Sequence, residues 1–227
     1  MNKAIILANG QFPKRREALQ AILQIPLVVC CDGAYNKLLS SQLLSHCSQL
    51  PEIHVVGDGD SRVKTQNDDS SPNVVFVDGY TDQETNDLTK AVKYAVSIGV
   101  ERMIILGACG LREDHTIGNI SLLAQYATMT TLSGKPLMVK MYTDYGFFTP
   151  LHNIGATTLP SFAGQQVSLF SLSEGLTISV EGLKYPIVKR ALRFLWEGTL
   201  NEALGDTFSV TLEGEGSLLV YQTHYSK

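Results

Sequence analysis

Two aspartates placed two residues apart, Asp58 and Asp60, are the residues of this sequence best suited to chemistry. If the chain is extended there, both carboxylates point the same way, and the flanking Gly57 and Gly59 leave room for a ligand to approach closely. Close carboxylates repel and tend to take up protons unless a cation lies between them. Mg²⁺ prefers oxygen ligands and is commonly held by carboxylates together with phosphate oxygens. The pair therefore predicts a magnesium and phosphate site.

Three further aspartates follow other apolar segments in the same way. Asp32 comes directly after an apolar run, Asp87 lies in the first turn of a predicted helix, and Asp114 opens another predicted helix. Taken alone, each of these acids is more simply explained as a helix cap or a turn residue. Four loops of this kind along one chain nevertheless favour a shared acidic site.

A glycine-containing loop at residues 107–115 is a candidate for binding phosphate groups. It runs into the N-terminus of a predicted helix, where free backbone N–H groups and the helix dipole attract anions. Arg112 could hold phosphate oxygens with two parallel hydrogen bonds; a surface ion pair with a neighbouring acid is the alternative. His115 is expected to make a neutral polar contact there. A second candidate nucleotide-binding loop follows the first apolar run and contains Asn9 and Gly10.

These side chains are positioned by the part of the chain up to about residue 144, in which apolar segments alternate with amphipathic ones. This alternation predicts an α/β fold with a largely parallel sheet and helices on both faces. Ligands of such sheets bind outside the carboxyl ends of the strands, so the acids should gather at one edge. Thr85 is expected to cap one helix and Gly99 to end it. The predicted strands are 4–7, 27–30, 53–57, 74–77, 103–106 and 137–142, and the predicted helices are 15–23, 36–44, 85–98 and 114–126.

The rest of the chain has a different sequence pattern. Short segments rich in β-forming residues alternate with glycines, which predicts an all-β sandwich. We expect an α/β catalytic domain that binds nucleotide and metal at residues 1–146 and a β-sandwich domain at residues 147–227. The segment 147–155 is the expected connection. The predicted strands of the second domain are 167–172, 177–180, 208–212 and 217–221.

Composition narrows the class of protein. The chain has 227 residues, 44% of them hydrophobic, and a net charge of −4, which does not favour a nucleic-acid binder. No signal peptide is visible and no apolar run approaches the ~20 residues that a membrane span needs, so we expect a soluble cytoplasmic protein. The four cysteines form no CxxC pair, which favours reduced, partly buried thiols over a zinc or redox site.

The motifs together resemble those of the thiamine pyrophosphokinases. Each motif is weak, but the set keeps the order of the family and covers nearly the whole chain. The resemblance implies a transferase of thiamine diphosphate biosynthesis that uses ATP and Mg²⁺, and a homodimer with active sites between subunits. The matching motifs are residues 7–10, 31–34, 57–61, 82–90, 110–115, 182–186 and 201–202.

The resemblance also assigns roles to residues. Asp58, Asp60 and Asp87 would bind Mg²⁺ and act in catalysis together with Arg112. Tyr185 would cover the thiamine rings, and an aromatic face does attract a thiazolium cation; a core or edge position in the sandwich is the alternative. The residues implied to bind the substrates or the nucleotide are Asn9, Asp32, Gln83, Thr85, Arg112, Asp114, His115 and Tyr185.

One residue departs from the family pattern. Leu200 stands where family members often carry a serine before the Asn-Glu pair. A hydroxyl contact to thiamine from that position is therefore in question.

The reaction implied is direct attack of the thiamine hydroxyl on the β-phosphorus of ATP, with AMP leaving and no covalent enzyme intermediate. Such a transfer needs chiefly alignment and charge neutralisation. Asp87 or Asp60 would accept the hydroxyl proton, and the sequence does not choose between them. Two alternatives remain: a metal-dependent phosphohydrolase that activates water at the same acids, and a nucleotide- or vitamin-binding sensor without catalysis.

Overall fold

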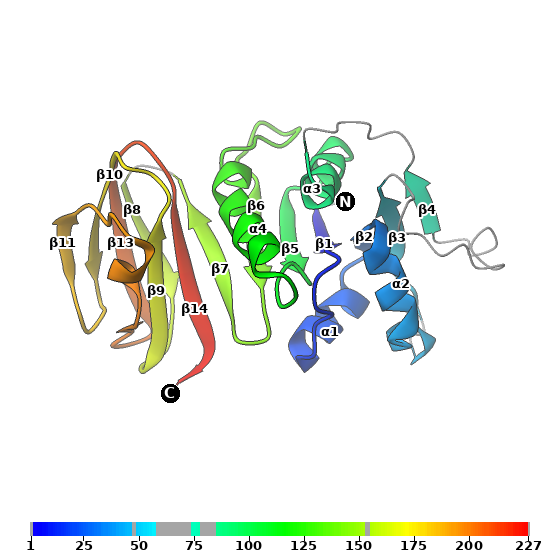
Figure 1. Ribbon diagram of the computed structural model, residues 1–227, viewed down its shortest axis with the longest axis horizontal. Helices are drawn as coiled ribbons and strands as arrows, with labels where there is room; N and C mark the ends of the chain where they lie inside the picture. Colours follow the sequence, from blue (N-terminus) through cyan, green and yellow to red (C-terminus); the bar gives the residue numbers. More distant parts are fainter. Residues whose placement is uncertain (1, 47–48, 58–73, 78–84, 153–154, 227) are drawn as a thin grey trace. The chain divides into compact units, whose positions relative to one another are not determined.

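The computed structural model of the protein consists of two compact units (Figure 1). The first comprises the residues up to 122 together with 129–144, and the second comprises residues 123–128 and those from 145 onwards. Asp58, Asp60 and Gln83 lie outside the described residues, so their roles stay predictions. The described residues are 2–46, 49–57, 74–77, 85–152 and 155–226.

The first unit contains a parallel sheet in the order β6-β5-β1-β2-β3-β4. Ile5 in the middle of the sheet pairs with Val28 on one side and with Ile104 on the other. All six predicted strands are confirmed. The prediction rested on nearly uninterrupted apolar runs, which are typical of strands that are covered on both faces. The strands are β1 (Lys3–Leu7), β2 (Leu27–Cys31), β3 (Glu52–Val56), β4 (Val74–Val77), β5 (Arg102–Leu106) and β6 (Met138–Tyr142).

Helices alternate with these strands along the chain, as predicted. One of them begins earlier than expected: α2 starts at Asp32, not at residue 36, so Asp32 is a helical residue and not a loop residue. An acidic side chain in the first turn is stabilised by the helix dipole, and Cys31, still extended, takes the N-cap position. The helices are α1 (Arg16–Gln24), α2 (Asp32–Ser40), α3 (Asp87–Ser97) and α4 (Glu113–Tyr126), with a short 3₁₀ helix η1 (Leu43–His46).

The caps of α3 and α4 correct two predictions. Asn86, not Thr85, caps α3, and its side-chain oxygen accepts a hydrogen bond of 2.9 Å from the backbone N–H of Thr89. Asparagine is a better N-cap than threonine. Gly99 follows the end of α3 with φ of +91°, as expected for the residue that ends a helix. Because α4 begins at Glu113, Asp114 lies in its first turn and is not its cap.

The second unit is a sandwich of two antiparallel sheets, in the orders β12-β9-β14-β7 and β11-β10-β13-β8. Its core combines buried side chains from both sheets, among them Val167, Leu169, Ile178, Val210 and Val220. The strands are β7 (Gly146–Leu151), β8 (Gly155–Pro160), β9 (Gln165–Ser171), β10 (Leu176–Glu181), β11 (Ile187–Arg190), β12 (Asn201–Glu202), β13 (Thr207–Gly214) and β14 (Leu218–Ser226), and a 3₁₀ helix η3 (Leu195–Gly198) precedes β12.

The sandwich confirms the predicted fold class but corrects the expected connection at residues 147–155. Most of that segment belongs to strand β7, which pairs with β14. The ring of Phe148 on β7 packs against Tyr221 on β14, with ring centroids 4.7 Å apart. Aromatic side chains favour a pleated, half-buried surface, and that preference decides the conformation here.

Candidate functional site

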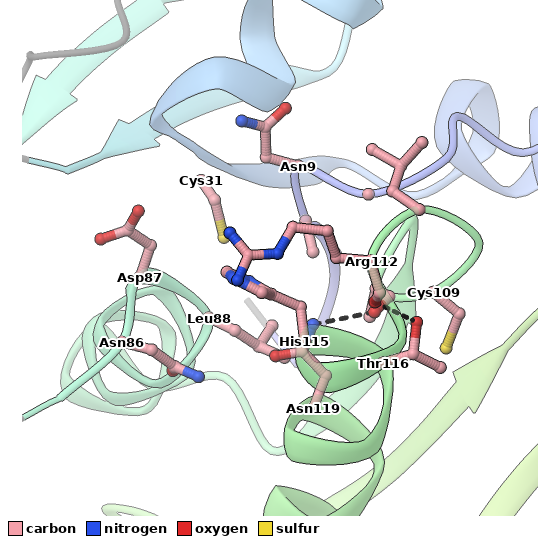
Figure 2. Close-up of a pocket in the computed structure, with 14 residues that line it drawn as sticks. Asn9, Cys31, Asn86, Asp87, Leu88, Cys109, Arg112, His115, Thr116 and Asn119 are labelled. Atoms are coloured by element: carbon pink, nitrogen blue, oxygen red, sulfur yellow. Dashed lines mark hydrogen bonds between the residues drawn. The ribbon is translucent and has the colours of Figure 1, made fainter.

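A pocket of about 350 Å³ lies in the first unit (Figure 2). Its walls come from the end of β2, from the segments that follow β1 and β5, and from the N-terminal parts of α3 and α4. Ligands of parallel sheets bind at this end of the strands. The lining residues are Ala8, Asn9, Gly10, Cys31, Asn86, Asp87, Leu88, Ala108, Cys109, Leu111, Arg112, His115, Thr116 and Asn119.

Backbone hydrogen bonds hold two of these loops against each other. The N–H of Gly10 donates to the carbonyl of Gly107 at 2.6 Å, and the N–H of Gln11 donates to the carbonyl of Cys109 at 2.8 Å. These bonds continue the pairing of β1 with β5 beyond the ends of the strands. A Cβ atom on Gly10 would lie 2.4 Å from the carbonyl oxygen of Gly107. The close approach therefore requires glycine at position 10.

Lys37 of α2 fixes the same loop from the other side. Its Nζ donates to the carbonyl oxygens of Asn9 and Gly10, at 2.7 Å each. Burial lowers the pKa of Lys37, and the two carbonyl dipoles stabilise the charged ammonium. The sequence motifs do not predict this role of Lys37. No spacing in the sequence points to it. The structure shows that α2 approaches this loop closely, because a Cβ atom on Gly33, one helical turn before Lys37, would lie 2.3 Å from Nδ2 of Asn9.

Two of the predicted acids come to this end of the sheet. Asp87 lines the pocket from the first turn of α3, with its side chain half exposed and 3.4 Å from the Nζ of Lys90. Asp32 is buried and lies against Gly57, the residue that follows β3. Burial raises the pKa of the Cys31 thiol well above its usual value, and the charges of Asp87 and Asp32 add to the effect. Both carboxylates are therefore close to the end of β2.

Arg112 and His115 extend across the pocket in the direction of Asp87 (Figure 2). The guanidinium of Arg112 makes two hydrogen bonds to Asp114, of 3.1 and 2.6 Å. This pair lowers the pKa of Asp114, with a further contribution from the backbone N–H of His115, and it raises the pKa of Arg112. Both side chains are more than half exposed, so the pair is weak. Arg112 thus forms the surface ion pair that was the alternative, at the edge of the pocket.

Two lining residues of α4 were not predicted from the sequence. Thr116 and Asn119 lie one turn after Arg112 and His115, and helical residues three or four apart share a face. The side chain of Asn119 donates to the carbonyl oxygen of Ala108 at 2.8 Å, which ties α4 to the loop after β5. A polar stripe at helical spacing was the signal that could have identified them.

Tyr185 belongs to the second unit. Its side chain is 59% exposed, so the alternative of a core position in the sandwich is wrong. Thr85 is half-buried and does not line the pocket of the first unit. Within the described residues no three metal-ligating side chains cluster.

The comparisons with known proteins agree with the sequence motifs. Residues 19–132 match the family model for the thiamin pyrophosphokinase catalytic domain, and residues 146–221 match that for its substrate-binding domain. The chain belongs to the thiamin pyrophosphokinase family. This result confirms the resemblance and the predicted activity, thiamine pyrophosphorylation.

Solved structures of thiamin pyrophosphokinases share the fold. The enzyme from Bacillus subtilis is 18% identical with a TM-score of 0.73, over 98% of this chain and 99% of that chain. The enzyme from Candida albicans is 16% identical with a TM-score of 0.77, over 98% of this chain and 88% of that chain. The yeast enzyme is 16% identical with a TM-score of 0.73, over 98% and 86% of the two chains. No match was found among curated protein sequences.

Two further observations concern the described residues of this thiamin pyrophosphokinase. In the ranges that the structure describes, no helix has the length and apolar character needed to cross a membrane. Cys30, Cys31 and Cys109 are free thiols, as predicted, and burial raises the pKa of Cys109 to about 11.

Replacing Gly10 by alanine tests the contact between the loops. The added Cβ would push against two backbone carbonyls and separate the loops, so we expect a loss of about 1–3 kcal/mol in the free energy of unfolding and a higher KM for ATP. Urea unfolding and steady-state kinetics measure both. Gly118→Ala is the matched control, because nothing lies within 4 Å of its added Cβ and α4 gains a better helix former. If Gly10→Ala has the unfolding free energy and the KM for ATP of the wild type, the close contact between the two loops is not needed for stability or ATP binding.

Proposed function

We propose that the pocket of the first unit binds the phosphate groups of ATP, and that the enzyme transfers the terminal pyrophosphoryl group to the hydroxyethyl oxygen of thiamine. The observation that carries this proposal is the opening of two helix N-termini, those of α3 and α4, onto one pocket at the carboxyl ends of the strands. The positive ends of both helix dipoles attract a polyphosphate there. Arg112 adds a cation at the rim.

Asp87, with Asp58 and Asp60, would hold Mg²⁺. Asp87 suits the role because its carboxylate is half exposed at the pocket, and the Nζ of Lys90 is as far as 3.4 Å away. All three ligands are carboxylates, which fits a hard cation that keeps part of its coordination shell for phosphate oxygens. When bound, Mg²⁺ would neutralise charge on the phosphates and on the departing AMP.

The transfer itself needs few covalent roles from the protein. The hydroxyl oxygen of thiamine forms a bond to the β-phosphorus while the bond from that phosphorus to the α,β-bridging oxygen breaks and AMP leaves. Asp87 or Asp60 accepts the hydroxyl proton. Arg112 exchanges its weak, exposed pair with Asp114 for a bidentate contact to phosphate oxygens. The residues proposed to surround the substrates and the nucleotide are Asn9, Asp32, Gln83, Thr85, Arg112, Asp114, His115 and Tyr185.

The second unit would supply part of the thiamine site and the contacts of a homodimer. In this arrangement residues 1–146 form the catalytic domain and residues 147–227 the domain that contributes to thiamine binding, with each active site lying between subunits. Support comes from large apolar side chains that are more than half exposed on the second unit, since exposed apolar surface often marks a protein interface. They include Tyr185, Val188, Phe194, Trp196 and Leu200. A cytoplasmic location stays a prediction from the sequence.

Product analysis tests the proposed reaction against its alternatives. With purified protein, ATP and Mg²⁺, we expect AMP and thiamine diphosphate to form only when thiamine is added, and EDTA to stop the reaction. Release of phosphate or AMP without thiamine would instead indicate a phosphohydrolase. Saturable binding of ATP or thiamine with no product would indicate a sensor.

Replacing Tyr185 by alanine tests the thiamine contact. Loss of a cation–π contact of ~1–2 kcal/mol should raise the KM for thiamine by about tenfold, while the KM for ATP stays within about twofold of the wild type. Tyr225→Ala is the control, because Tyr225 is an exposed tyrosine of the same unit outside the proposed site. A thiamine KM that does not change in Tyr185→Ala would remove this residue from the site.

A further inference from the structure

The buried side-chain amide of Asn201 forms hydrogen bonds to the main chain of an exposed tyrosine, Tyr185. Only 5% of Asn201 is accessible, whereas Tyr185 is 59% exposed. The backbone N–H of Tyr185 donates to Oδ1 of Asn201 at 3.0 Å, and Nδ2 of Asn201 donates to the carbonyl oxygen of Tyr185 at 2.7 Å. One side chain therefore holds both polar groups of a single residue's main chain.

These two hydrogen bonds of Asn201 lie where the backbone pairing between residues 182–184 and 202–204 ends. The N–H of Leu204 donates to the carbonyl of Gly182 at 3.0 Å, and the N–H of Lys184 donates to the carbonyl of Glu202 at 2.8 Å. Pro186 has no N–H to continue this pattern. The side chain of Asn201 takes over at this point and fixes the main chain of Tyr185.

The residue before Asn201 is held in a strained conformation. Leu200 has a φ of +61°, in the left-handed region that a leucine rarely adopts, and its side chain is 74% exposed. Strained residues persist where the surrounding structure over-determines them, and they cluster at ligand sites. The neighbouring turn is secured by the hydroxyl of Thr199, which donates to the carbonyl of Trp196 at 2.7 Å.

The hydrogen bonds of Asn201 leave little of its amide free for a ligand. Oδ1 also accepts from the backbone N–H of Glu202 at 2.9 Å, so this oxygen already has two donors. Nδ2 has one hydrogen left after its bond to Tyr185. Burying an amide is costly unless it is hydrogen-bonded, and here that requirement is met by the main chain of the tyrosine segment.

We propose that Asn201 is a positioning residue that sets the affinity for thiamine by fixing the main chain of Tyr185, and through it the ring, in the orientation that receives the substrate. This inference rests on the proposed role of Tyr185 in the thiamine site. Leu200, in place of a hydroxyl-bearing residue, contributes a turn that leads into Asn201 and no polar contact of its own side chain. An aromatic ring held by its backbone loses less freedom when a cationic heterocycle stacks on it.

A double-mutant cycle on the purified enzyme tests the proposal. Asn201→Ala should raise the KM for thiamine by about tenfold and leave kcat and the KM for ATP within about twofold. Adding Asn201→Ala to Tyr185→Ala should raise the thiamine KM by less than about twofold further, because both changes remove the same contact. Asn201→Asp keeps the two accepted hydrogen bonds but replaces the donated one with a repulsive contact between a carboxylate oxygen and the carbonyl oxygen of Tyr185, so it should also raise the thiamine KM.

Gln222→Ala controls for loss of a buried amide. Gln222 is 1% exposed in the same unit, and its side-chain amide donates to the carbonyl oxygen of Pro160 and to Oε1 of Gln165. It should lower the unfolding midpoint without raising the thiamine KM. If Asn201→Ala does not fold, Asn201→Asp carries the test through its thiamine KM.

The outcomes separate the two hypotheses. If Tyr185→Ala raises the thiamine KM but neither change at Asn201 does, the positioning role is wrong and the thiamine contact stands. Fully additive effects in the double mutant would likewise overturn the positioning role. If Tyr185→Ala has no effect, the proposed thiamine contact itself fails.

Discussion

Hydrogen bonding that continues past the ends of β1 and β5 is the constraint on which the pocket depends. The strands pair in parallel from Lys3 to Leu7, and the bonds from Gly10 to Gly107 and from Gln11 to Cys109 carry the contact into the loops. Loops at the ends of parallel strands usually diverge to connect to helices. Here they stay together, and the ammonium of Lys37 donates hydrogen bonds to the carbonyl oxygens of Asn9 and Gly10. The result is a fixed wall of backbone groups at the edge where ligands of α/β sheets bind.

The charges of the pocket follow from this arrangement. The first turns of α3 and α4 bring Asp87, Arg112 and His115 to one cavity, so both signs of charge are within reach of one ligand. Asp32 is buried beside Gly57, which follows β3. Burial disfavours the Cys31 thiolate, and the carboxylates of Asp87 and Asp32 add to the effect. A divalent cation bound there would offset the charge of these carboxylates. Membership of the thiamin pyrophosphokinase family agrees with this chemistry.

Strands could be predicted from the sequence because apolar runs leave few alternatives, and α3 and α4 could be predicted from their periodicity. The start of α2 could not, since an Asp-Gly pair reads equally as a turn, and Asp32 is helical because a helix N-terminus stabilises it. The pair of Arg112 with Asp114 was foreseen only as an alternative. The roles of Lys37 and of Asn201, which belongs to a matching motif, could not be predicted, because they are hydrogen bonds to main chain that is distant in sequence. Position along the chain carries no trace of such contacts.

The central claim is that carboxylates at this edge of the sheet bind Mg²⁺ for the transfer, and the Mg²⁺ dependence of Asp87→Asn tests it most directly. Asn86 caps α3, so the helix should survive the change at Asp87, and an unchanged unfolding midpoint would verify this. The claim predicts that turnover falls by orders of magnitude and that half-maximal rate needs more Mg²⁺, while Asp206→Asn on the exposed surface of the second unit behaves as the wild type. Wild-type turnover with an unchanged Mg²⁺ requirement in Asp87→Asn would contradict it.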